Sequence, residues 1–84
     1  MKFNKWLKEK PEFTEDCICI CRTGFVDREG RRSYEYEAYM ISEQLADEAD
    51  DDNYITYMGW FDLGGDEYGD LNELEADEYF LIKI

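Results

Sequence analysis

The chain has 84 residues, enough for one domain spanning 1–84, and its 44% hydrophobic and 17% aromatic content excludes intrinsic disorder. Its formal net charge of −13 excludes direct binding to nucleic acid and to anionic membranes, because both would repel it. Basic residues are concentrated in 1–32, whereas residues 33–82 contain no lysine or arginine.

The sequence carries no signal for export or membrane insertion. No segment approaches the ~20 apolar residues of a membrane-spanning helix, and the first residues lack the apolar centre of a secretory signal. Three cysteines are an odd number for a secreted disulfide scaffold. We therefore expect a cytoplasmic protein with reduced thiols.

The first predicted element is a short turn or helix at the N-terminus. Phe3, Trp6 and Leu7 recur at helical spacing, and Pro11 ends the segment because proline cannot donate a backbone hydrogen bond. This turn or helix is expected to pack Trp6 onto a sheet.

Residues 16–26 and 32–41 are predicted to form the two strands of a hairpin. In the first strand three cysteines at 17, 19 and 21 alternate with isoleucines, which is the two-residue period of a pleated strand. Both faces begin apolar, so we expect this strand to be central and covered on both sides. The turn at 27–30 ends in Gly30, which tolerates positive φ.

The second half of the chain is predicted to contain two further strands. Residues 42–53 are expected to be a surface loop, because the like charges of 47–52 favour solvation. Strand periodicity returns at 54–61 and 78–84, separated by a long glycine-rich turn at 62–69 and a short helix at 70–76. The predicted fold is α+β and mainly β, with about four antiparallel strands (16–26, 32–41, 54–61, 78–84) and one or two short helices.

Several of these segments resemble those of short phage and prophage proteins of unknown function. The matching pieces are Trp6 followed after four residues by Pro11, the apolar strand at 17–21, the pair Gly59-Trp60, and the ending at 70–82. The resemblance spans most of the chain and rests on structural residues. It implies a mobile-element origin in a bacterial cell, and it implies no activity.

Catalysis and dedicated metal binding are not expected. The chain has no histidine, so a nucleophile–histidine pair of the common kind cannot form. Thiols at alternate strand positions lie ~6.6 Å apart, too far to share one zinc ion, and are expected to be small buried core residues. The acid-rich segment 62–73 departs from the EF-hand pattern and predicts only weak, adventitious divalent binding. We expect no enzyme and no cofactor.

The acidic surface is the predicted functional feature. A basic cleft shaped for nucleic acid also attracts another polyanion, and tyrosines interleaved with the acids favour an interface. We expect a phage- or prophage-type accessory protein that binds and inhibits a host protein with a basic surface, such as a nucleic-acid-binding protein. The predicted binding surface consists of Glu35, Glu37, Asp47, Glu48, Asp50, Asp51, Asp52, Tyr54, Asp66, Glu67, Tyr68 and Asp70.

An alternative is a small structural or self-associating module with no inhibitory role. In that case the acidity confers solubility and keeps exposed strand edges apart. Self-association would use an apolar face bearing exposed tyrosines or Trp60. The sequence does not fix the oligomeric state.

Overall fold

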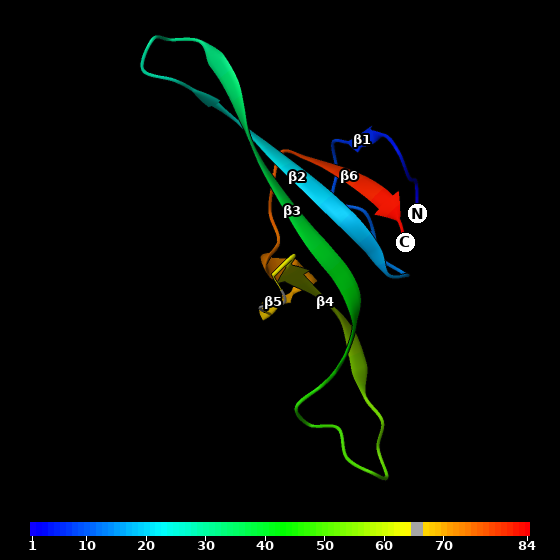
Figure 1. Cartoon of the computed structure of the whole chain (residues 1–84). Helices are drawn as coiled ribbons and strands as arrows, with labels where there is room; N and C mark the ends of the chain where they lie inside the picture. Colours follow the sequence, from blue (N-terminus) through cyan, green and yellow to red (C-terminus); the bar gives the residue numbers. More distant parts are fainter. Residues whose placement is uncertain (65–66) are drawn as a thin grey trace.

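The computed structural model describes residues 1–64 and 67–84, and within them six strands form one antiparallel sheet (Figure 1). The spatial order is β1-β6-β2-β3-β4-β5. A single 3₁₀ turn is the helical content of the described chain, far short of a helix able to cross a membrane. The elements are β1 (Trp6–Leu7), β2 (Cys17–Val26), β3 (Arg32–Leu45), β4 (Thr56–Asp62), β5 (Glu67–Asp70), η1 (Leu71–Glu73) and β6 (Glu78–Lys83).

The predicted hairpin of β2 and β3 is confirmed. Its register runs from Cys17 opposite Ile41 to Val26 opposite Arg32, and the turn is closed by the Gly30 amide donating to the Asp27 carbonyl at 3.0 Å. β3 continues beyond β2 and pairs its last residues with β4. β3 therefore runs along the length of an elongated molecule of 57 × 25 × 21 Å (Figure 1). The hairpin tip lies at one end of this molecule and loop 46–55 at the other.

The hydrophobic core lies on one face of the sheet. Cys17, Cys19 and Cys21 of β2 are buried there, as expected, beside Ile41 of β3 and Leu81 of β6. The core is completed by Phe13 and Leu74, which come from the two connecting segments on either side of the strands. Burying these apolar side chains is the main stabilising contribution to the fold.

The expectation that β2 is covered on both faces is wrong. β2 is central in the sheet, but Ile18 and Ile20 on its second face are only half-buried. Both segments that contribute to the core, with Phe13 and Leu74, pack against the cysteine face. A sheet of this kind has one face on the core and leaves the other open.

The predicted N-terminal turn or helix is also wrong, because Trp6 and Leu7 form β1, although Trp6 packs onto the sheet as expected. They pair with Phe80 and Tyr79 at the edge of β6, and the Asn4 amide donates to the Leu81 carbonyl at 2.8 Å. A helix of one or two turns is unfavourable to nucleate, whereas a sheet edge offers ready backbone partners.

Three boundaries in the second half differ from the prediction. β3 extends to Leu45, so loop 46–55 is shorter than the expected 42–53. Part of the expected turn at 62–69 is strand, since β5 pairs with β4 at Gly69 and Trp60. The predicted helix at 70–76 is reduced to η1, although Asp70 caps it as expected, its carboxylate accepting from the Asn72 amide at 2.9 Å. Pairing with neighbouring strands outcompetes these weak local signals.

Candidate protein-binding surfaces

Loop 46–55 is held in shape by its own backbone. At its base the Ala46 amide donates to the Ile55 carbonyl at 2.9 Å. At its far end Asp50 and Asn53 exchange amide-to-carbonyl hydrogen bonds of 3.0 and 3.2 Å, and the Asp50 carboxylate accepts from the Asp52 amide at 2.9 Å. The acidic residues are therefore displayed on a closed, hydrogen-bonded loop.

The loop concentrates negative charge without a matching cation. Its acids Asp47, Glu48, Asp50, Asp51 and Asp52 are all exposed, and Tyr54 beside them is 81% exposed. The ion pairs found among the described residues involve only the arginines at 22 and 31, which lie elsewhere. Exposed carboxylates with no cation beside them leave a strongly negative local potential at this end of the molecule.

The predicted binding residues do not form one surface. Glu35 and Glu37 belong to β3 and share a small hollow with Glu75 on the cysteine side of the sheet. Glu37 is eight residues before Leu45, where β3 ends and the loop begins, a separation of about 26 Å along the strand. The acids are thus divided between the middle of the sheet and the loop at its end.

One hollow does bring part of the predicted set together. Asp47 and Glu48 line it from the base of the loop, and Asp70 lines it from the start of η1, with Tyr57 and Met58 between them. The backbone carbonyl of Asp70 accepts from the Trp60 indole nitrogen at 2.8 Å. Asp70 is therefore a structural cap as well as an acid beside the loop.

Glu67 and Tyr68 contribute their backbone to β5, and Asp66 lies outside the described residues. Trp60 is 9% exposed and belongs to the core, so the expectation that it helps form an exposed apolar face is wrong.

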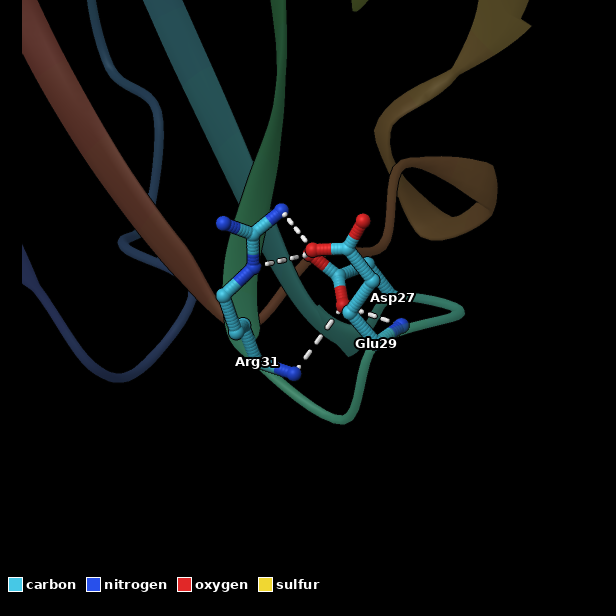
Figure 2. Close-up of polar contacts among 3 residues, drawn as sticks. All are labelled: Asp27, Glu29 and Arg31. Carbon is cyan, nitrogen blue, oxygen red and sulfur yellow. Dashed lines mark hydrogen bonds and ion pairs between the residues drawn. The ribbon is translucent and has the colours of Figure 1, made fainter.

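The hairpin tip between β2 and β3 is a second charged feature, and it is basic where the loop is acidic. The Asp27 carboxylate accepts from the amides of Glu29 and Arg31, and the Arg31 guanidinium pairs with Asp27 at 3.3 Å and Glu29 at 2.6 Å (Figure 2). Arg31 thus forms ion pairs with both acidic residues of the tip. Arg28 and Arg32 have no ion pair within the described chain and carry the uncompensated charge there.

The open side of the sheet bears an aromatic cluster that the sequence pattern did not predict. We call this surface the aromatic face. Its residues alternate with the core residues along β1, β6, β2 and β3, and the strand register places them side by side. They are Trp6, Ile18, Ile20, Arg22, Tyr34, Tyr36, Ala38, Met40, Glu78, Phe80 and Ile82.

Arg22 lies at the centre of the aromatic face. Its guanidinium carbon is 3.9 Å from the ring centroid of Trp6 and 4.6 Å from that of Tyr34, and it pairs with Glu78 at 2.9 Å. The hydrogen bond with Glu78 raises the pKa of Arg22 above its usual value. Trp6 also contacts Phe80, with ring centroids 5.3 Å apart. Tilted ring pairs and stacked guanidinium groups of this kind are mutually attractive.

The cysteines offer little chemistry to a substrate or metal. Cys19 and Cys21 are in sulfur contact at 3.9 Å, and this hydrogen bond, together with burial, raises the pKa of the Cys19 thiol. The same hydrogen bond lowers the pKa of the Cys21 thiol. Burial and the nearby carboxylates of Glu15 and Asp16 raise the pKa of Cys17 to about 11. No three potential metal ligands of the described residues lie close enough together to hold an ion. Buried, protonated thiols such as those of Cys17 and Cys19 are poor nucleophiles.

Comparisons with protein-family models, with curated proteins and with solved structures give no match. The resemblance to short phage and prophage proteins therefore stays a prediction. The functional assignment rests on the chemistry of the chain's own surfaces, namely the acidic loop, the basic tip and the aromatic face.

Proposed function

We propose that this chain is a non-enzymatic accessory protein, of phage or prophage type, that binds and inhibits a host protein with a basic surface. The contact is made by loop 46–55, whose carboxylates take the place of the phosphates that a nucleic-acid-binding protein expects. The observation that supports this proposal is the exposed, cation-free loop at one end of the molecule.

The loop is suited to such a contact for two physical reasons. Its hydrogen bonds hold in shape the backbone that carries the carboxylates, so less conformational entropy is lost when the complex forms. Its position at the end of a 57 Å molecule lets it enter a cleft that a broad acidic surface could not reach. Tyr54 adds a large, exposed ring next to the charges, and tyrosine is a frequent interface residue.

The test compares two variants with the same change in net charge. The loop variant carries Asp47→Asn, Glu48→Gln, Asp51→Asn and Asp52→Asn, and it keeps Asp50 because that carboxylate holds the turn. The control variant replaces four exposed acids outside the loop: Glu9→Gln, Glu12→Gln, Glu15→Gln and Glu73→Gln.

Each immobilised variant is exposed to the heparin-retained protein fraction of a bacterial lysate and eluted with a salt gradient. The wild type and the control should retain the same basic protein, and the loop variant should release it at clearly lower salt. Duplex DNA added before elution should compete with the wild-type chain. Equal elution of the loop and control variants, or no competition by DNA, would contradict the proposal.

A further inference from the structure

The aromatic face is depleted in acids to a degree that solubility does not explain. The chain has 22 acidic residues, yet Glu78 is the one acid among the strand residues that form this face, and it is paired with Arg22 at 2.9 Å. At the edge of the face the Asp77 carboxylate accepts a hydrogen bond from the Gly24 amide at 2.8 Å. The opposite face of the same β3 strand carries unpaired carboxylates at Glu35 and Glu37. Successive residues of β3 thus point to two different faces, one charged and one apolar, although both faces are exposed to solvent.

The composition of the face is that of a protein interface. Tryptophan, tyrosine and arginine are the residue types that dominate binding energy, and charged residues are depleted from interface centres. Here Trp6, Arg22 and Tyr34 are stacked on one another at the centre of the face. Tyr34 and Tyr36 remain 49% and 56% exposed, so their apolar area is still available to a partner.

The molecule also exposes more surface than a chain of its size should. Its accessible surface is 6190 Å², whereas a compact monomer of 10.1 kDa exposes about 5,300 Å². Its radius of gyration is 15.1 Å, against about 12 Å for a compact 84-residue domain. The excess of roughly 900 Å² is close to the about 800 Å² that each partner buries in a standard interface.

The opposite charges at the two ends of the molecule favour a second copy of the chain as the partner. The hairpin tip at 27–32 has a net charge of +1, with Arg28 and Arg32 unpaired in the described chain, and loop 46–55 has a net charge of −5. These two features lie at opposite ends of the long axis (Figure 1). In a two-fold, antiparallel arrangement each tip would meet the loop of the other copy, so the same complementary contact would form twice.

We propose that the aromatic face binds a second copy of this chain, antiparallel, with the basic hairpin tip of each copy against loop 46–55 of the other. The net charge of −13 on each copy does not prevent this. At an ionic strength of about 0.15 M, charges more than about 8 Å apart are largely screened, so the apolar contact and the tip–loop pairs decide the outcome. The proposal goes beyond the binding of a host protein, because it assigns a role to the aromatic face and gives loop 46–55 a second contact.

Sedimentation velocity from about 1 to about 500 µM chain, at about 0.15 M salt, tests the association. The wild type should shift from one to two chain masses. Tyr36→Glu should raise the dissociation constant at least about tenfold, because it places a carboxylate in the centre of the interface. Leu63→Glu is the control, a carboxylate introduced at an exposed apolar side chain outside the aromatic face, the hairpin tip and loop 46–55, and should leave the constant unchanged. Circular dichroism should show the wild-type fold in both variants.

The arrangement is tested by distance measurements between spin labels at two exposed positions. Arg28→Cys places a label on the tip and Asp51→Cys places one on the loop, while the native cysteines are buried. In a mixture of the two singly labelled chains a short distance between labels is expected, whereas two tip labels should be far apart. A wild type that stays monomeric throughout, equal effects of Tyr36→Glu and Leu63→Glu, or a short tip-to-tip distance would overturn the proposal.

Discussion

The guanidinium carbon of Arg22 lies 3.9 Å from the centre of the Trp6 ring, which connects the central strand of the sheet to its edge. Glu78 on the intervening strand β6 holds the other side of the same guanidinium at 2.9 Å. The short edge strand β1 has only two residues of backbone pairing, so this side-chain contact accounts for much of what fixes it to the sheet.

Replacing Trp6 with leucine should therefore destabilise the fold. Trp6→Leu removes the cation–π contact with Arg22 and the ring contacts with Phe80 and Tyr36, and the unfolding free energy should fall by about 1–2 kcal/mol. Urea denaturation at a low micromolar chain concentration measures this loss apart from association. Tyr54→Leu, at an exposed position, should change stability by less than about 0.5 kcal/mol. Similar losses in both variants would show that Trp6 does not hold β1.

The hairpin tip depends on the backbone conformation of Gly30. Its φ is 78°, a left-handed value that alanine adopts with strain and asparagine tolerates better. No atom lies within 4 Å of the position that a Cβ would occupy there, so backbone strain is the main effect of a substitution. Gly30→Ala should lower the unfolding free energy by about 1 kcal/mol, and Gly30→Asn by clearly less. Thermal or urea unfolding checks the order, and an equal loss in the two variants would argue against the strained turn.

Stability should decrease in alkali because of the buried thiols. Burial raises the pKa of Cys17 from 9.0 to about 11 in the folded chain. Between these values the unfolded chain loses its proton first, so the unfolding free energy falls as pH rises, by up to about 1.4 kcal/mol per pH unit for one thiol. Below pH 9 both states are protonated and this contribution is fully present.

The matched variant is Cys17→Ala, which removes this titration. Its unfolding free energy should be lower at neutral pH, since a buried side chain is shortened, but it should decline less steeply between pH 9 and 11. Urea unfolding at a series of pH values measures both slopes. Parallel slopes for the variant and the wild type would show that Cys17 titrates alike in the folded and unfolded chains.

The local sequence signals located the central part of the sheet. Alternation along 17–21 and 34–41, with Gly30 between them, predicted the β2–β3 hairpin and the burial of the three cysteines. The acid run at 47–52 predicted an exposed loop. These features follow from interactions within a few residues: the pleat alternates side chains, glycine permits the turn, and like charges remain in water.

The edge strands could not be predicted, because their hydrogen bonds come from distant residues. Trp6 and Leu7 have helical spacing, yet they pair with residues more than seventy positions away. Gly69 of β5 lies in a glycine-rich segment that reads as a turn until β4 is present beside it. Strand pairing at an edge is decided by available backbone partners, which local propensity does not contain.

By itself, the sequence determined that the chain is acidic, rich in strands and organised around one hairpin with a cysteine core. Only the tertiary structure decided that both Phe13 and Leu74 pack on the cysteine face and leave Trp6, Tyr34 and Tyr36 on an open one. It also placed the basic tip and the acidic loop at opposite ends. The physical reason is that alternation divides a strand into two faces, but the path of the connecting segments selects the face that is buried.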